Sequence, residues 1–310
     1  MIGNSKNIKG ESHLLILMYH RIRTDNFLGI NKYYDAANVL LKNDVFLKQI
    51  DFIARNYKVI RLSDVNYAMA SRMNSRGNIC ALTFDDGFSE HYNLVFPLLK
   101  KYNITATFFV PTQHLVEKTP RWLDVMYYIF SHTKVGEVKL TTENKVIGKF
   151  NIKSNSEVKI LKNILKKMNS EKRCVAMKEL ADKLKVNINN EKIIREFYIS
   201  ENNIREMSKE GMEFGVHTVS HPLLTAISAK DARMEIGNSK RTILKLSKQK
   251  KISFAYPFGG LDSYDGSIIS IVKSLGFENA CTSIPGINSS NTDRYRLKRV
   301  AAEKFISSED

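Results

Sequence analysis

Two adjacent carboxylates follow a short apolar run in the stretch CALTFDDGFSEHY, residues 80–92. Asp85 and Asp86 come directly after residues 80–84, whose apolar character predicts a buried strand. In parallel sheets and barrels, catalytic groups gather where the strands end at their carboxyl side. Adjacent residues at a strand end point in different directions, so the two carboxylates can have different roles. The alternative for an isolated Asp-Asp-Gly is a helix N-cap beside a surface charge.

A second group of polar residues lies in the stretch GVHTVSHP, residues 215–222. His217 and His221 are four residues apart, but Pro222 disfavours helical backbone at His221. We therefore expect a strand that ends near His217, with His221 capping a short helix that has Pro222 at its first position. Both imidazoles would then lie in a strand-end loop, either as metal ligands or as structural histidines.

One carboxylate and two imidazoles together form a three-ligand site with open coordination positions. A catalytic zinc or a similar divalent ion requires this arrangement. The second carboxylate is then free to accept a proton from a water molecule that the metal activates. The two groups of residues therefore predict metal-assisted hydrolysis.

Apolar runs predict the strands that position these residues, at 13–19, 79–84, 104–110, 213–216 and 252–255. Because the runs are continuous rather than alternating, we expect strands covered on both faces, as in a parallel α/β sheet. Helical patterns lie between them, at 91–102 with Pro97 as a kink and Asn103 as a left-handed cap, at 228–247 with Ser228 as N-cap, and at 263–275 before Gly276. This alternation predicts an α/β fold, either barrel-like or doubly wound.

The segment between these two sets of strands has a different pattern. It contains an aromatic helix at 122–130, two strands at 137–140 and 146–152 around the polar TTEN, and a lysine-rich helix at 157–168. We interpret residues 113–199 as an insertion between core halves 12–112 and 200–305 of one domain that spans 1–310. It is too long for an ordinary loop of such a fold.

The composition is that of a globular protein, with 43% hydrophobic and 26% charged residues among 310. Three widely spaced cysteines suit a reducing compartment. The N-terminal apolar run LLILM is shorter than a signal-peptide core of roughly 7–15 residues, and no segment approaches the roughly 20 apolar residues of a membrane span. We therefore expect a cytoplasmic location.

The formal net charge of +16 suggests anionic partners. The lysines are spread along the chain, however, and this is equally consistent with generic solvated side chains. The sequence has no basic block interleaved with aromatic residues and no known nucleic-acid motif, so we do not expect nucleic acid as a partner.

The motifs TFDDG at 83–87 and HTVSH at 217–221 resemble the first two motifs of the polysaccharide deacetylases (carbohydrate esterase family 4, the NodB-homology domain). The resemblance covers about residues 13–112 and 200–300. The stretch FAYPFGG at 254–260 resembles the third motif only in part, because the usual arginine before the proline is absent. This form is similar to a branch in which the motif order is permuted and the catalytic histidine lies near the N-terminus. The stretch LMYHRI at 17–22 fits that branch.

The resemblance implies a distorted (β/α)7-type barrel with the helical and hairpin insertion described above. It implies Asp85 as catalytic base, His20 as general acid, and Asp86, His217 and His221 as metal ligands. Arg299, in YRLKRV, is expected to replace the missing orienting cation of the third motif. The expected substrate contacts are Tyr256, Pro257, Phe258 and Gly259, with core aromatics as the alternative for Tyr256 and Phe258.

The implied reaction removes the N-acetyl group from an amino sugar in a polysaccharide or glycan precursor, nucleotide-linked or lipid-linked. The implied metal is Zn2+, with Co2+ or Ni2+ as alternatives. Other functions left open are removal of a formyl or O-acetyl group and non-catalytic carbohydrate binding. The helix at 157–168 suggests peripheral association with an anionic membrane through Ile160, Leu161, Ile164, Leu165 and Met168. The alternative is that this apolar face packs against the rest of the protein.

Overall fold

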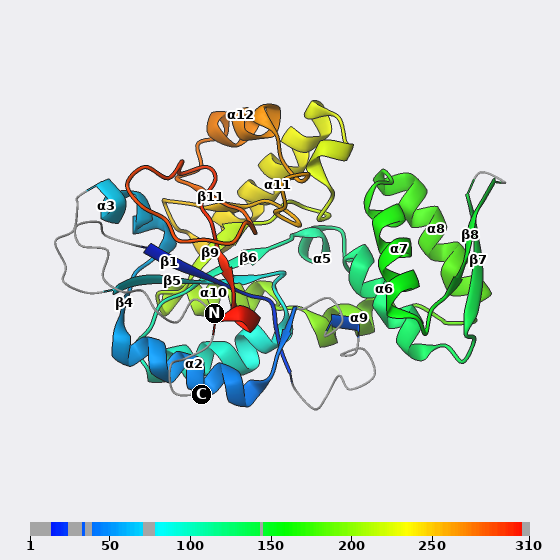
Figure 1. Cartoon of the computed structure of the whole chain (residues 1–310), viewed down its shortest axis with the longest axis horizontal. Coiled ribbons are helices and arrows are strands. Elements are labelled where there is room, and N and C mark those ends of the chain that lie inside the picture. Colours follow the sequence, from blue (N-terminus) through cyan, green and yellow to red (C-terminus); the bar gives the residue numbers. More distant parts are fainter. Residues whose placement is uncertain (1–13, 24–32, 35–38, 71–77, 143–144, 306–310) are drawn as a thin grey trace.

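The computed structural model describes residues 14–23, 33–34, 39–70, 78–142 and 145–305 (Figure 1). Its centre is a curled parallel sheet in the order β11-β10-β9-β6-β5-β1-β12, with β4 also paired to β5. The strands are β1 (Leu14–Tyr19), β4 (Tyr57–Val59), β5 (Asn78–Asp85), β6 (Thr107–Val110), β9 (Glu213–Val216), β10 (Phe254–Ala255), β11 (Ala280–Cys281) and β12 (Val300–Ala301). The predicted α/β fold with a distorted barrel is confirmed. The predicted strand residue His13 lies outside the described residues.

A C-terminal segment lies between the two ends of the curled sheet. Val300 pairs with Leu17 of β1, and Leu297 forms a parallel bridge with Cys281 of β11. The Leu297 N–H donates to the carbonyl of Ala280 at 2.9 Å. Residues 297–301 therefore connect both edges of the sheet, and this places Arg299 inside the barrel.

Helices cover both sides of the sheet, with α2 and α4 on one side and α11 and α12 on the other (Figure 1). The helices of the core are α2 (Asn43–Asn56), α3 (Val65–Ala70), α4 (Phe96–Lys101), α10 (Glu201–Lys209), α11 (Ala229–Ser247) and α12 (Gly266–Ser274). Between β5 and α4 the chain forms a π-helical turn (His91–Val95). A small two-stranded sheet pairs β2 (Arg21–Ile22) with β3 (Leu40–Leu41).

The predicted helix ends are confirmed in most places. Asn103 has φ of 54°, as a left-handed cap requires. Pro97, predicted as a kink inside a helix over 91–102, instead lies in the first turn of α4, directly after the π-helical turn. Ser228 accepts a hydrogen bond from the Asp231 N–H at 3.1 Å at the start of α11. The helix predicted from residue 263 begins later, at Gly266, because Asp265 caps it by accepting from the Ile268 N–H.

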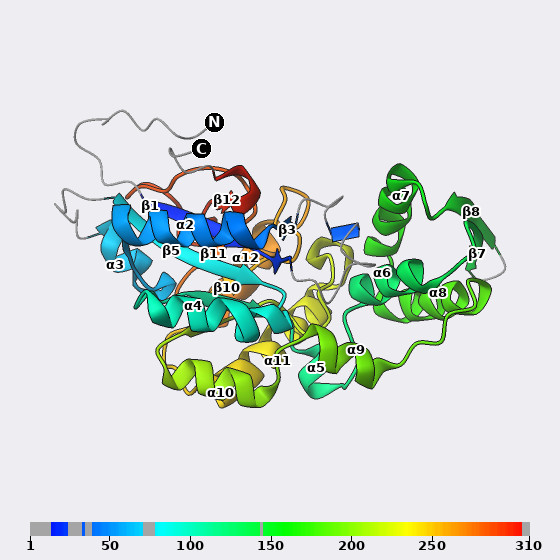
Figure 2. The ribbon, with the colours of Figure 1, turned by 90° about the horizontal axis from the view of Figure 1, so that it is seen from below.

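The middle segment stands to one side of the sheet (Figures 1 and 2). Its elements are α5 (Gln113–Val116), α6 (Trp122–His132), β7 (Glu137–Thr142), β8 (Lys145–Asn151), α7 (Asn155–Lys166), α8 (Ser170–Lys183) and α9 (Asn190–Phe197). They contribute most of an apolar cluster, which residues 33, 34, 40 and 88 of the core also join. The cluster includes Met126, Ile129, Leu161, Leu180 and Ile193, all 0% exposed. We keep the division into core halves and an insertion as a prediction.

The apolar face of α7 packs inside the protein. Leu161 and Leu165 are 0% exposed, and Ile164 and Met168 pack against the same cluster, whereas Ile160 is 54% exposed. This packing favours the second alternative for the helix at 157–168, because most of the face proposed for a membrane is already covered. Within the described ranges, no helix combines the length and the hydropathy that a bilayer crossing needs.

Candidate active site

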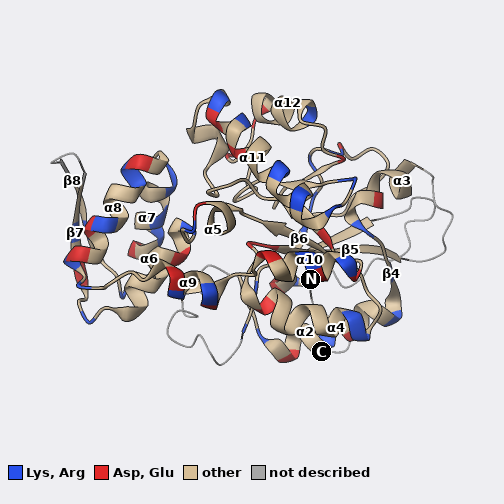
Figure 3. Cartoon of the chain, turned by 180° about the vertical axis from the view of Figure 1, so that it is seen from behind, with Lys and Arg blue, Asp and Glu red and all other residues tan. Residues whose placement is uncertain are grey.

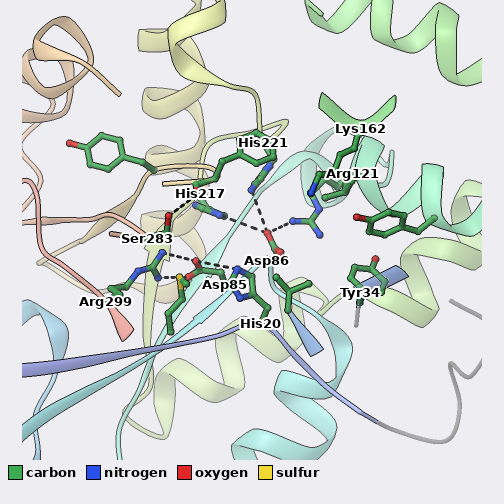
Figure 4. A pocket seen from close by; sticks show the side chains of 16 residues that line it. His20, Tyr34, Asp85, Asp86, Arg121, Lys162, His217, His221, Ser283 and Arg299 are labelled. Carbon is green, nitrogen blue, oxygen red and sulfur yellow. Dashed lines mark hydrogen bonds and ion pairs between the residues drawn. The ribbon is translucent and has the colours of Figure 1, made fainter. Parts of the chain in front are cut away.

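The two carboxylates at the end of β5 point in different directions (Figure 4). Asp85 is the last residue of the strand, while Asp86 and Gly87 have φ of 79° and 65°. A Cβ on Gly87 would lie 3.0 Å from Val110 Cγ1, so glycine suits this turn both sterically and in its backbone angle. Asp85 and Asp86 are 2% and 6% exposed, and each therefore needs a charged partner.

The partner of Asp85 is Arg299. Nη1 and Nη2 of Arg299 donate to the two carboxylate oxygens of Asp85, both at 2.8 Å. Nε of the same guanidinium donates to the carbonyl of Thr282 at 2.8 Å. Burial alone would raise the pKa of Asp85, but Arg299 lowers it below its usual range. Asp85 is thus an oriented, ionised carboxylate, and each of its oxygens retains a further lone pair.

His20 lies next to this pair, in the connection between β1 and β2. Its Nε2 is 3.9 Å from Asp85 Oδ2, and its side chain is 17% exposed, so it faces the cavity. His91 Nε2 donates to the His20 carbonyl at 2.7 Å. The neighbouring Arg21 pairs with Glu90 at 2.7 Å. Glu90 and His91, which follow the Asp-Asp-Gly turn, therefore hold the backbone at His20 in place.

His217 and His221 lie on the other side, next to Asp86. Their Nε2 atoms are 3.8 and 3.6 Å from Asp86 Oδ1, and one potential ligand atom from each of the three residues lies within 4.8 Å of the others. His217 Nδ1 donates to the Ala255 carbonyl at 2.8 Å, and this leaves the Nε2 lone pair directed at Asp86. Burial lowers the pKa of both histidines, so both are neutral imidazoles, the form that binds a metal.

These residues fit a divalent cation. Asp86 Oδ1 is buried and accepts no hydrogen bond within the described part of the chain, although it is ion-paired with Arg121. Burial would raise the pKa of Asp86, but the Arg121 guanidinium keeps it far below its usual range. A buried carboxylate oxygen beside two neutral imidazoles is a donor set that zinc and similar ions bind.

The loop that contains the two histidines has strained backbone. Thr218 and His221 have φ of 67° and 57°, and Thr218 Oγ1 accepts from the His221 N–H at 3.1 Å. Glu235 of α11 accepts from the Val219 and Ser220 N–H groups at 2.8 and 2.9 Å. The loop is therefore held by a carboxylate from another element.

The prediction that His221 caps a short helix beginning at Pro222 is wrong. The next helical turn is a 3-10 turn at Leu224–Ala226, which begins after Leu223. The physical reason is the backbone conformation: His221 has φ of 57°, whereas an N-cap residue has extended backbone, and Leu223 is itself extended, with φ of −73° and ψ of 106°.

Arg121, at the start of α6, is a site residue that the sequence motifs do not include. Its Nη1 forms an ion pair with Asp86 Oδ1, while Nε and Nη2 donate to the two oxygens of Asp124 at 2.9 Å. Asp124 also accepts from the hydroxyl groups of Tyr34 and Tyr198. The signal in the sequence was an Arg-x-x-Asp pair at a helix start, within a segment we set apart from the core.

The two aspartates, their two arginine partners and the three histidines line one cavity of about 270 Å³ between the sheet and the middle segment, namely Asp85, Asp86, Arg121, Arg299, His20, His217 and His221 (Figure 4). Phe258 lines the cavity, with its ring 4.8 Å from that of His221. Tyr256 also lines the cavity, but it is 1% exposed and its hydroxyl donates to the Tyr295 carbonyl at 3.0 Å, which favours the core alternative for this ring. Pro257 and Gly259 are not among the described residues that line the cavity, and they shape the turn that carries Phe258.

The fold and the site thus describe an α/β barrel with paired carboxylates and two histidines at its strand ends. The family model of the polysaccharide deacetylases matches residues 72–280, which is more than half of the chain. The chain belongs to this family of hydrolases, which act on amide bonds.

Known proteins show the same likeness. The protein YxkH of Bacillus subtilis is 20% identical over 95% of this chain and 73% of its own length. The poly-beta-1,6-N-acetyl-D-glucosamine N-deacetylase of Staphylococcus aureus (strain MSSA476) is 30% identical over 122 residues, which span 37% of this chain and 42% of that protein. The structure of Streptococcus pyogenes deacetylase PplD in complex with acetate has a TM-score of 0.60 at 22% identity and covers 94% of this chain and 93% of its own. At 22% identity, the similarity to PplD shows a shared fold and nothing more.

Proposed function

We propose that this protein is a metal-dependent N-deacetylase that acts on an N-acetylated amino sugar in a polysaccharide or glycan precursor. The observation that carries this proposal is the Asp86, His217 and His221 cluster, which faces the same cavity as Asp85 and His20. The donor set suits Zn2+, and Co2+ or Ni2+ would fit it as well.

The chain's own residues supply the proton transfers of an amide hydrolysis. The metal, when bound, supplies Lewis acidity and lowers the pKa of water. Asp85, kept ionised and oriented by Arg299, accepts the proton of the water that attacks the acetyl carbon. His20, in its protonated form, donates to the nitrogen as the carbon–nitrogen bond breaks, since an unprotonated amine is a poor leaving group. The products are acetate and a free amino sugar.

The staphylococcal relative is named for a polymer of N-acetyl-D-glucosamine, and this supports an amino-sugar substrate. Whether the sugar is polymeric, nucleotide-linked or lipid-linked is part of the test below, as is removal of a formyl or O-acetyl group. Lys and Arg are distributed over the core and the middle segment (Figure 3), so we propose no nucleic-acid partner. The cytoplasmic location stays a prediction.

The test is acetate release from free, nucleotide-linked, lipid-linked and oligomeric N-acetylamino sugars. The wild type and Asp85→Asn are compared after chelation and after add-back of zinc, cobalt or nickel. We expect metal-dependent release that Asp85→Asn lowers roughly 10²–10⁴-fold. A folded protein that binds metal but releases no acetate from any member would refute the N-acetyl assignment, and the same panel with formyl and O-acetyl sugars would then identify the acyl group.

A further inference from the structure

Helix α7 places two lysines, one turn apart, on the side that faces the core. The second of them, Lys166, has partners there. Its Nζ lies 3.1 Å from Asp262 Oδ2 and 4.4 Å from the centre of the Phe258 ring. This ion pair and cation–π contact attach α7 to the turn beside the metal-ligand candidates. The helix is therefore a wall of the active-site cavity.

The first lysine, Lys162, lines the cavity itself, beside Arg121 (Figure 4). Within the described ranges, its ammonium group makes no ion pair and no hydrogen bond with a protein group. Burial first, and then repulsion from Lys166 and Lys159, lowers its pKa. Lys162 is thus a partly desolvated cation in the reaction cavity without a counter-ion.

The acids that line the cavity, and Asp124 next to Arg121, are already engaged. Asp124 receives two hydrogen bonds from Arg121, and Asp86 is paired with Arg121 and adjacent to the two histidines. Asp85 is bound at both oxygens by Arg299. A cation without a partner in a partly buried place lowers stability unless a ligand neutralises it. The proposed reaction increases the need for an anion in the cavity, because its product is a free amine that becomes a second cation there.

We propose that Lys162 forms an anion-binding subsite, so that the substrate carries a phosphate or carboxylate group beside the acetylated amino sugar. This inference rests on the proposed function and specifies its substrate class. Two sources offer such a group: a phosphate on the sugar, as in a nucleotide- or lipid-linked precursor, and the carboxylate of a neighbouring uronic acid. A neutral polymer of N-acetylated sugars has no group that would neutralise Lys162.

The first experiment measures binding without turnover, by calorimetry on the Asp85→Asn protein. The probes are N-acetylglucosamine, N-acetylglucosamine 1-phosphate, and a disaccharide of N-acetylglucosamine with glucuronic acid. We expect at least one anionic probe to bind about 10-fold more tightly than the neutral sugar, since a charge pair near a protein surface is worth about that factor or more. The anionic probe that gains affinity identifies the source of the charge.

The variant Lys162→Met, which keeps an apolar side chain of similar length, should abolish this preference, and Lys162→Arg should retain it. The matched control is Lys159→Met, on the same helix but exposed, with the same change of charge. Equal preference in Lys162→Met and Lys159→Met would overturn the inference.

A second measurement separates this inference from the proposed function. Pyrophosphate alone is titrated into the metal-free protein, where no metal competes for the anion. Weaker binding in Lys162→Met than in Lys159→Met supports the subsite even when no sugar of the panel is deacetylated. Conversely, the protein could release acetate from a neutral sugar as fast as from an anionic sugar and bind no anion. That result would support the proposed function and overturn the subsite.

Discussion

Two neighbouring aspartates have different partners, and at the scale of the residue this difference defines the site. Asp85 is clamped by Arg299 from the C-terminal segment, whereas Asp86 faces Arg121 from α6 and two imidazoles. Both carboxylates are ionised, but only Asp86 has two imidazole Nε2 atoms within 4 Å of one of its oxygens, those of His217 and His221. The chemistry therefore assigns proton transfer to the oriented carboxylate and metal binding to the other.

Replacing Arg299 by lysine should impair the base without removing the charge. A lysine cannot donate to both oxygens of Asp85, so the carboxylate loses its orientation, and we expect kcat to fall about 10-fold or more. Because the hydrogen bonds from Arg299 contribute to the lowered pKa of Asp85, weakening them raises that pKa even though the positive charge stays, and the acid limb of the pH–kcat profile moves to higher pH. The control is Arg296→Lys, at an exposed arginine of the same segment. An unmoved acid limb would show that Arg299 does not tune the base.

The metal ligands can be tested without any substrate. We expect His217→Ala and His221→Ala to lose most of the bound zinc, as measured by elemental mass spectrometry after dialysis, because each removes one of three ligands. His132→Ala is the matched control, since this histidine is exposed and distant from the cluster. If His217→Ala bound as much zinc as His132→Ala, the metal site would have to lie elsewhere.

At the scale of the element, the site depends on how two loops fit together. The turn after β10 and the loop after β9 meet where the Phe258 ring contacts His221. Gly259 has φ of 64°, and its carbonyl accepts from the Ser283 N–H at 2.9 Å. The backbone of one strand end is therefore bonded to the next, and a change there should reach the histidines.

Gly259→Ala tests this dependence. A Cβ at this position would lie 2.5 Å from the Ser283 backbone nitrogen, so the turn has to move. We expect a loss of about 1–3 kcal/mol in the free energy of unfolding, measured by urea denaturation, and reduced zinc affinity as well. Gly266→Ala is the control, because no atom lies within 4 Å of its Cβ and it begins α12. That change should alter stability by no more than about 1 kcal/mol. Equal effects of the two changes would contradict the tight fit at Gly259.

The elements that are determined by neighbouring residues in the chain could be predicted from the sequence. The strand at 213–216 and the caps at Asn103 and Ser228 follow from apolar runs and from side chains a few residues away. The conformation of His221 could not be predicted, because it depends on Glu235, which reaches the loop from α11. Local patterns contain no information about such a partner.

The same limit applies to the candidate site as a whole. Asp85, Asp86, His217 and His221 could be identified because short motifs contain them. Arg121 and Lys162 could not, since their roles arise only when the middle segment lies against the barrel.

At the scale of the whole molecule, the barrel and the middle segment enclose the cavity together, and several ionisable groups are buried within the fold. His114 of α5 is one of them, 4% exposed and stacked on Tyr198 with ring centres 4.6 Å apart. Its Nε2 donates to the Ile199 carbonyl at 3.0 Å. Burial lowers the pKa of His114 from 6.5 to about 4. The His114 imidazole is therefore neutral in the folded protein at neutral pH.

The consequence is a loss of stability in mild acid. Between about pH 4 and pH 6.5 the unfolded chain binds a proton at His114 that the folded chain does not. The free energy of unfolding therefore falls as the pH falls through this window, by up to about 1.4 kcal/mol per pH unit for each such histidine. Urea denaturation of the metal-free protein at pH 7.5, 6.5, 5.5 and 4.5 measures this slope.

His114→Gln should lower the stability at pH 7.5, because the ring contact with Tyr198 is lost, but it should also flatten the slope by about one proton. His132→Gln, at an exposed histidine, should leave the slope unchanged. His91, His217 and His221 are also buried with lowered pKa values, so part of the slope remains in His114→Gln. A slope as steep in His114→Gln as in the wild type would mean that His114 takes up its proton in the folded state, and this would contradict its assignment as a buried neutral side chain.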